Sequence, residues 1–157
     1  MRAAGEVVAE QYIDWPDPEG QEIVERLFAA DAALRAHFEE TAAAVGVTVP
    51  QAHTLLQLGQ PQRMGQIAGQ LHCEPSHVTG IADALEQCGF LRREPDPDDR
   101  RAKRLVLTAS GQDLRGRLLA HLFERAPIIS VLNVDQRTAL LSLLRLAQSA
   151  ADPSSRR

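Results

Sequence analysis

The stretch that decides the fold runs from Met64 to Gly111 and reads MGQIAGQLHCEPSHVTGIADALEQCGFLRREPDPDDRRAKRLVLTASG. Its first part predicts two short helices, Met64–Leu71 and Pro75–Cys88, because apolar residues recur on one side of each at helical spacing. Three residues, His72–Glu74, join the two segments. Two helices with polar outer positions and a three-residue turn between them are typical of a helix-turn-helix.

The second part of the stretch changes to a period of two after Gly89, a residue type that commonly ends a helix. Phe90–Glu94 and Lys103–Leu107 are predicted to be short strands, because the segment between them is rich in turn residues. That segment, Pro95–Ala102, is the charged tip of a hairpin. A helix-turn-helix followed by a charged hairpin describes a winged helix.

Longer helices flank this winged helix on both sides. Apolar residues at intervals of three and four predict a helix over Gln21–Val45. A capping-box pattern, Thr48–Gln51, starts the helix that precedes the helix-turn-helix. Thr108 caps a helix that runs to Pro127, and Asn133–Gln136 resembles another capping box in front of a leucine-rich run. The predicted fold class is therefore mainly α with a small antiparallel β-wing.

Composition excludes several classes of protein. A chain of 157 residues with 44% apolar and 24% charged residues has the composition of one globular domain. No apolar run approaches the roughly 18 to 20 residues of a membrane span, and the first residues lack the apolar core of a secretory signal. Two cysteines are too few for a disulfide framework. We therefore expect a cytoplasmic protein without a membrane partner.

The net charge of −4 is unfavourable for a nucleic-acid binder, but the charges are unevenly distributed along the chain. Residues 1–40 hold ten acids and three bases, whereas residues 92–104 hold six bases and four acids. The hairpin is thus a short basic segment in an acidic protein, and the local field governs docking more than the total charge does. Taken alone, such a charge run is more typical of a solvated hairpin.

The ordered motifs of this stretch resemble those of the MarR family of transcriptional regulators. They are Met64-Gly-Gln-Ile-Ala, Val78-Thr79, Leu85-Glu-Gln-Cys-Gly-Phe-Leu91, Asp99-Arg-Arg101 and Leu107-Thr-Ala-Ser-Gly111. The last two match that family's wing pattern, an Asp-x-Arg and then a Leu-Thr-x-x-Gly. The resemblance is dense over residues 64–111 and looser in helical layout over residues 21–150.

This resemblance implies one MarR-like domain over residues 21–150, with the winged helix at 48–108 and dimerisation helices at 21–45 and 109–150. Residues 1–20 are then an N-terminal arm, and residues 151–157 a disordered tail.

Family members are homodimers built from their first and last helices. A leucine-rich run in the last helix fits that role, because it is too apolar for one solvent-facing helix. Its members are Leu140, Leu141, Leu143 and Leu144. The alternative is a helix buried within one subunit.

A recognition helix in the major groove offers the outer positions of its first turns to base edges and phosphates. In this sequence those positions hold small or polar residues: Ser76, His77, Thr79 and Gly80. The family pattern implies that Arg101 enters the minor groove, whose negative potential attracts arginine, and that Asp99 orients it. The other cations of the wing are predicted to contact phosphates. They are Arg100, Lys103 and Arg104. A surface ion pair is the alternative for Asp99 and Arg101.

Gly80 departs from the family pattern, since many relatives carry a basic residue at this place. Glycine costs a helix roughly 1 kcal/mol relative to alanine and offers no side-chain contact. Either base readout by this helix is sparse, so that the wing and DNA shape contribute more, or the missing side chain allows a close approach of the backbone. Both explanations stay open.

Relatives often bind small aromatic effectors between the dimerisation helices and the winged helix. By analogy, an effector pocket is predicted here, although isolated residues of these types are more often plain core or surface. Its lining would be His37, Phe38, His53 and the arm residues Tyr12 and Trp15.

No cofactor, metal site or catalytic site is predicted. The five histidines include no i,i+4 pair, and no His-Cys spacing resembles a metal site. Peroxide-sensing relatives keep their reactive cysteine in the first helix, where this chain has none; Cys73 is expected to be buried and Cys88 at best partly exposed. A Gly-rich phosphate loop, a nucleophile elbow and a catalytic triad are all missing from the sequence, so we do not expect an enzyme.

The sequence thus predicts a transcriptional regulator, a ligand-responsive homodimeric repressor that binds a pseudo-palindromic operator in double-stranded DNA. The alternative is a winged-helix protein-interaction module that has lost specific DNA binding. Gly80 and the acidic balance of the chain favour that alternative.

Overall fold

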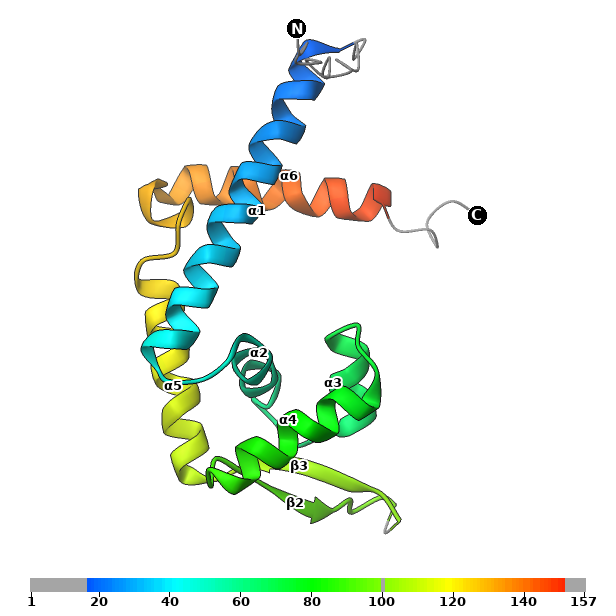
Figure 1. Ribbon diagram of the computed structural model, residues 1–157. Helices are drawn as coiled ribbons and strands as arrows, with labels where there is room; N and C mark the ends of the chain where they lie inside the picture. Colours follow the sequence, from blue (N-terminus) through cyan, green and yellow to red (C-terminus); the bar gives the residue numbers. More distant parts are fainter. Residues whose placement is uncertain (1–16, 100, 152–157) are drawn as a thin grey trace, which may run out of the picture.

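The computed structural model describes residues 17–99 and 101–151, which form six α-helices, one 3-10 helix and three strands (Figure 1). In chain order they are α1 (Pro18–Ala44), α2 (Val49–Gln57), β1 (Gln62–Arg63), α3 (Met64–Gln70), α4 (Pro75–Gln87), β2 (Leu91–Pro95), β3 (Lys103–Leu107), α5 (Ala109–Glu124), η1 (Ile129–Val131) and α6 (Val134–Ala151). This order confirms the predicted fold class, a mainly α chain with a small antiparallel β-wing.

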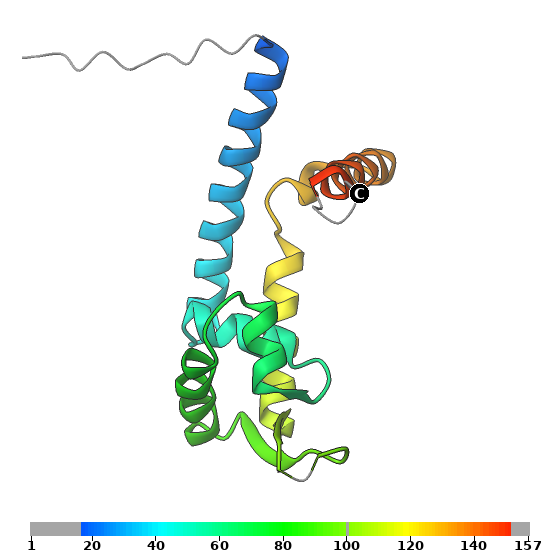
Figure 2. The same ribbon diagram turned by 90° about the vertical axis from the view of Figure 1, so that its right-hand side faces the viewer.

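α1 is a long rod that extends away from most of the molecule. Helices α2, α3 and α4 and the β2–β3 hairpin gather towards its C-terminal end, whereas its N-terminal turns point away from them in both views (Figures 1 and 2). α5 starts beside the hairpin and leads back along α1 to α6, which lies level with the middle of α1. The winged helix therefore occupies one end of the molecule, and α1 and α6 form the other.

The wing belongs to a three-stranded antiparallel sheet with the order β1-β3-β2. β2 and β3 pair in one register, from Leu91 opposite Leu107 to Pro95 opposite Lys103. β1 contributes two residues, which pair with the middle of β3. A strand of two residues has no alternation to detect, which is why the sequence did not predict β1.

The core lies inside the winged helix and receives side chains from α1 to α5 and from both strands of the hairpin. Its largest fully buried apolar side chains are Leu55, Ile67, Val78, Leu85, Leu91, Leu105, Leu114 and Leu118. On α4, Val78, Ala82 and Leu85 are buried and Ile81 is partly buried, as the sequence predicted. Burial of this side leaves the opposite side of α4 in water.

Both predicted capping boxes form. Thr48 Oγ1 accepts a hydrogen bond from the Gln51 N–H (3.4 Å), and the Gln51 side chain accepts one from the Thr48 N–H (2.9 Å). Asn133 and Gln136 are joined in the same reciprocal way, at 2.9 and 3.0 Å. Each box satisfies backbone donors that the first turn of a helix leaves without intrahelical partners. α2 and α6 therefore begin where the sequence predicted.

The start of α1 differs from the prediction. The helix begins at Pro18 rather than Gln21, because Asp17 caps it by accepting a hydrogen bond from the Glu19 N–H (3.2 Å). Proline fits the first helical position, where its missing N–H is not needed. Of the predicted arm, residues 1–16 lie outside the described residues. The predicted tail began at residue 151, but Ala151 is the last residue of α6, and residues 152–157 lie outside the described residues.

Gly111 of the Leu-Thr-x-x-Gly motif is buried against the chain that leaves α4. A Cβ atom at this position would overlap the carbonyl oxygen of Phe90, which accepts a hydrogen bond from the Thr108 N–H (3.1 Å). Gly111→Ala should therefore lower the free energy of unfolding by about 1–3 kcal/mol, the usual cost of overpacking. Urea denaturation followed by circular dichroism measures this change.

Gly116→Ala is the matched control on the same helix, because a Cβ atom at position 116 meets nothing within 4 Å. This control should keep the stability or raise it by up to about 1 kcal/mol. A Gly111→Ala protein as stable as the wild type would contradict the packing described for this motif.

Candidate nucleic-acid interface

α4 turns a polar, open face to solvent. The helix begins with Pro75, and the residues predicted to contact DNA from this helix are all exposed: Ser76, His77, Thr79 and Gly80. The Thr79 hydroxyl donates to the Pro75 carbonyl (3.0 Å) and keeps its capacity to accept a hydrogen bond. These four predicted contact residues lie within the first two turns of one helix.

The packing of the chain does not require glycine at position 80. A Cβ atom there would meet nothing within 4 Å, and the positive φ values recorded for glycines belong to Gly46 and Gly89. Gly80 therefore leaves a gap in the exposed face, next to Thr79. A bound surface can approach the helix backbone closely at such a gap.

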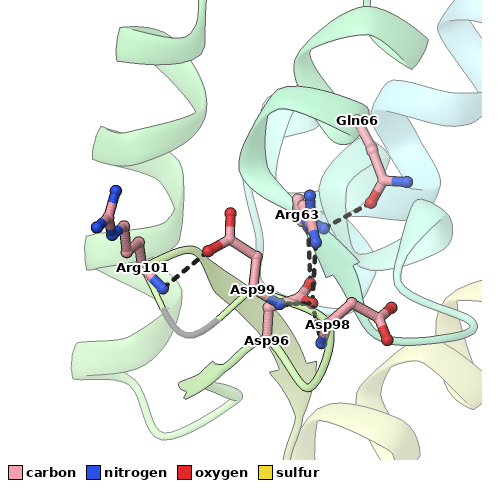
Figure 3. A network of polar contacts seen from close by, with 6 residues as sticks. All are labelled: Arg63, Gln66, Asp96, Asp98, Asp99 and Arg101. Carbon is pink, nitrogen blue, oxygen red and sulfur yellow. Dashed lines mark hydrogen bonds and ion pairs between the residues drawn. The ribbon is translucent and has the colours of Figure 1, made fainter.

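One buried carboxylate holds the base of the wing tip (Figure 3). Asp96, which is 7% exposed, accepts two hydrogen bonds from the Arg63 guanidinium (2.7 and 2.9 Å). It also accepts one from the Asp98 N–H (2.9 Å) and one from the Asp99 N–H (3.3 Å). The hydrogen bonds from Arg63, followed by the one from Asp98, hold the pKa of the Asp96 carboxyl well below its usual range.

Arg63 connects this carboxylate to the helix-turn-helix. Its backbone N–H donates to the side chain of Gln66 in α3 (2.8 Å), and its strand pairs with β3 at Arg104. Arg63 could not be predicted from the sequence, because a lone arginine in front of a helix forms no motif. Asp96 lies 33 residues further along the chain, and no local pattern joins the two.

Asp99 bonds to the backbone of Arg101. Its Oδ1 accepts a hydrogen bond from the Arg101 backbone N–H (3.0 Å), and the Arg101 guanidinium extends away from this contact (Figure 3). Among the described residues, no ion pair includes Arg101, so the surface ion pair considered above does not form. The Arg101 side chain is exposed. The wing tip thus combines hydrogen-bonded backbone groups at Asp98, Asp99 and Arg101 with an accessible cation.

The other predicted phosphate contacts of the wing are not equivalent. Arg104 is half-buried and forms an ion pair with Glu94 (3.3 Å). Glu94 also forms an ion pair with Arg92 (2.7 Å). These contacts, the hydrogen bond from Arg92 foremost, lower the pKa of Glu94. Lys103 is exposed, and Arg100 lies outside the described residues. Within the described chain, Lys103 is therefore the predicted phosphate contact that keeps its charge towards solvent.

Arg93 faces α4 rather than solvent. Its guanidinium bonds to the carboxylates of Asp83 (2.5 Å) and Glu86, and its backbone N–H donates to Glu86 (3.0 Å). The sequence analysis counted Arg93 with the other cations of the basic segment. The alternation of side chains along a strand could have separated the two neighbours, because it places Arg92 and Arg93 on opposite faces of the sheet.

The described members of the predicted effector pocket line different cavities. His53 stacks on Phe38, with ring centroids 4.2 Å apart, and borders a cavity of about 390 Å³ between α2 and α4. Burial lowers the pKa of His53. His37 borders a cavity of about 270 Å³ between α1 and α5. Tyr12 and Trp15 lie outside the described residues.

Both cysteines are more accessible than predicted. Cys73 is half-buried, and Cys88 is exposed because it is the C-cap residue of α4.

Across residues 17–99 and 101–151, no group of three or more His, Cys, Asp or Glu side chains could hold a metal ion. No helix in that part of the chain is long and apolar enough to cross a membrane.

A helix-turn-helix with an open second helix, joined to a hairpin with an ordered tip, defines the winged helix-turn-helix class. Comparison with known proteins is more specific, since residues 47–103 match the model of the MarR family. The chain is also 35% identical over 94 residues to the HTH-type transcriptional regulator YkoM of Bacillus subtilis. That alignment covers 59% of this chain and 61% of YkoM, so the chain spans about three fifths of that relative.

Two solved structures share the fold at 22% identity. One is Sco3205, a MarR family transcriptional regulator from Streptomyces coelicolor in complex with DNA, with a TM-score of 0.71 over 89% of this chain and 92% of that chain. The other is CouR from Rhodococcus jostii bound to p-coumaroyl-CoA, with a TM-score of 0.69 over 85% and 94%. These two structures show the fold, and the match of residues 47–103 to the MarR family model confirms the resemblance found in the motifs. The proteins of this family are transcriptional regulators, which are not enzymes.

Removal of the Asp96 carboxylate should loosen the wing tip. Asp96→Ala takes away the acceptor of the Asp98 and Asp99 N–H groups, so the hydrogen exchange of these two amides should accelerate at least about tenfold. Amide exchange followed by NMR measures this rate. The pKa of Asp96 is lower in the folded chain than its ordinary value of 3.8. Its ionised carboxylate therefore stabilises the folded state fully above pH 3.8, and this stabilisation is lost as the pH falls through the folded pKa.

Asp98→Ala is the matched control, since it removes a carboxylate from the same tip but spares Asp96. Exchange at Asp99 should then stay within about twofold of the wild-type rate. Unchanged exchange at Asp99 in Asp96→Ala would show that the tip keeps its shape without the buried carboxylate.

Proposed function

We propose that this chain is a homodimeric, DNA-binding transcriptional regulator, with α4 in the major groove and the wing tip in the adjacent minor groove. The observation that carries this proposal is the accessible guanidinium of Arg101 on a tip ordered by Asp96 and Asp99. An ordered tip that ends in a free cation suits a narrow minor groove. In this arrangement the exposed residues of α4 meet base edges, and Lys103 meets a phosphate.

The relatives support this assignment. Sco3205, which shares the fold, was solved in complex with DNA, and YkoM is named as an HTH-type transcriptional regulator. Since the chain spans about three fifths of YkoM, the activity of the whole protein belongs to the proposal. A cytoplasmic location follows from the proposal, because the regulator must reach its operator.

The apolar surface of α1 and α6 supports the homodimer. Large apolar side chains of both helices are exposed, among them Phe28 (71%), Leu143 (64%) and Leu146 (68%). Large apolar side chains that are exposed in such number on a single chain mark an interaction site. A second copy of the chain would cover it and would place two winged helices about one DNA turn, roughly 34 Å, apart on a pseudo-palindromic operator.

Response to a small aromatic ligand, with repression released on binding, is also part of the proposal. CouR, which shares the fold, was solved with p-coumaroyl-CoA bound. In this chain the cavity bordered by His53 has a suitable size, about 390 Å³, and its lining includes the apolar side chains of Val49, Leu71 and Ile81.

A protein-interaction module without specific DNA binding is the second candidate function. The observation in its favour is that four arginines of the wing and its base are paired with carboxylates: Arg63, Arg92, Arg93 and Arg104. A titration of the DNA upstream of the gene at several salt concentrations separates the two functions. Counterion release makes phosphate binding fall steeply with salt. Absent or salt-independent binding to duplex DNA would favour the interaction module.

Arg101→Ala should weaken operator binding at least about tenfold, or about 1.4 kcal/mol, because few free cations of the described wing can compensate. Thermal stability and dimer content should not change, since the side chain is exposed.

Lys103→Ala should weaken binding to all duplex sequences alike and flatten the salt dependence by about one ion. Fluorescence anisotropy with operator and random DNA measures both effects.

Arg92→Ala is the matched control for Arg101, because it removes an exposed arginine that is already paired with Glu94. It should cost less than about threefold in affinity. If Arg101→Ala binds the operator as tightly as this control, the wing does not enter the minor groove.

Leu144→Asp should shift the protein towards monomer and weaken operator binding in parallel. Leu144 is 41% exposed on α6, so a charge there disturbs the proposed interface more than the fold of one chain. Sedimentation equilibrium at micromolar concentration measures the dimer content. Ser142→Asp, which adds the same charge to an exposed polar position of α6, should remain dimeric. A wild-type chain that sediments as a monomer would disprove the homodimer.

A further inference from the structure

Arg93 is bonded to two carboxylates of α4 although it belongs to the wing. It is the third residue of β2, and its side chain is 17% exposed, compared with 57% for its neighbour Arg92. The guanidinium reaches Asp83 Oδ1 at 2.5 Å and also bonds to Glu86 Oε2. The Arg93 backbone N–H adds a third hydrogen bond, to Glu86 Oε1 (3.0 Å).

The link between α4 and β2 is held by backbone hydrogen bonds: the Phe90 N–H donates to the Leu85 carbonyl (2.9 Å), and the Phe90 carbonyl accepts from the Thr108 N–H (3.1 Å). α4 ends at Gln87, β2 begins at Leu91, and Gly89 between them has a φ of +75°. A left-handed glycine of this kind ends a helix. The backbone bonds act at the start of β2, whereas the angle between helix and hairpin also depends on contacts further along the strand. The three bonds of Arg93 to α4 cross the link and restrict that angle.

The two carboxylates lie on the part of α4 that continues its exposed face. Asp83 is three residues after Gly80 and four after Thr79, so it lies on the same side of the helix one turn further on. It is 53% exposed at the side chain, and Glu86 is 38% exposed. Carboxylates at this place would repel DNA phosphates, and the charge of Arg93 offsets one of the two.

We propose that Arg93 is a positioning residue that locks the wing to the recognition helix, so that Arg101 and the first turns of α4 reach the same DNA duplex together. The inference rests on the proposed DNA binding. Arg93 itself does not touch DNA in this arrangement, because its fork of N–H donors is occupied by Asp83 and Glu86. A lysine keeps the charge but lacks the planar fork that bonds to both carboxylates at once.

The lock can be measured without DNA. Spin labels at Ser76→Cys on α4 and Asp98→Cys on the wing tip, in a Cys73→Ser/Cys88→Ser background, report the distribution of distances between helix and tip by pulsed electron resonance. The distribution should be narrow in the otherwise unchanged chain and at least about twofold broader with Arg93→Lys. Arg92→Lys is the matched control on the neighbouring residue and should leave the distribution narrow. An equally narrow distribution with Arg93→Lys would overturn the lock.

The consequence for DNA binding is a coupling between Arg93 and Arg101. In the unchanged chain and in Arg92→Lys, the further change Arg101→Ala should cost at least about tenfold in affinity for duplex DNA. In Arg93→Lys, the same change should cost less than about threefold, because an unlocked wing has already lost its contact. Thermal melting of each variant separates this coupling from a loss of stability, and Arg93→Lys is used in place of alanine because it keeps the charge of the cluster.

The outcomes separate the lock from the proposed function. A tenfold cost of Arg101→Ala that persists in Arg93→Lys overturns the positioning role, even if Arg93 stabilises the fold. If the unchanged chain fails to bind duplex DNA in the salt titration, the proposed function fails, and the spin-label distances still decide whether Arg93 locks the wing.

Discussion

A hairpin tip that carries three carboxylates between Pro95 and Ala102 has no apolar core, so its shape must come from polar contacts, and Asp96 provides them. Its carboxylate joins Arg63, at the start of the helix-turn-helix, to the backbone of Asp98 and Asp99. Asp99 then bonds to the backbone of Arg101. The position of the exposed arginine thus depends on a chain of hydrogen bonds that begins at one buried carboxylate.

The two ends of the molecule differ in what stabilises them. The winged helix contains the core, to which α1 to α5 and the hairpin contribute. No described side chain of α6 belongs to that core, and the leucines of α6 are mostly exposed. Apolar side chains such as Phe28 of α1 are exposed at the same end, which is why we propose that a second copy completes it. α5 runs from the hairpin towards α6 and connects the two ends (Figure 1).

Helix caps, helical spacing and strand patterns predicted most of the fold, because each depends on residues that are close in the sequence. The capping box at Thr48 and Gln51, the inward positions of α4 and the strand at Lys103–Leu107 all follow from sequence neighbours, and the structure has them. Contacts between distant residues were not predictable in this way. The Arg63–Asp96 pair spans 33 positions, and the bonds of Arg93 depend on how β2 packs against α4. The sequence therefore predicted a basic hairpin, whereas pairing leaves few of its described cations free.

The central claim is that an ordered wing carries Arg101 into the minor groove beside a recognition helix of the same subunit. Hydroxyl-radical footprinting on the DNA upstream of the gene tests it most directly, because the radicals cut from the minor groove. We expect two protected minor-groove segments related by a two-fold axis, and loss of both in Arg101→Ala while the dimer persists. Protection that is absent, or that is identical in Arg101→Ala, would contradict it.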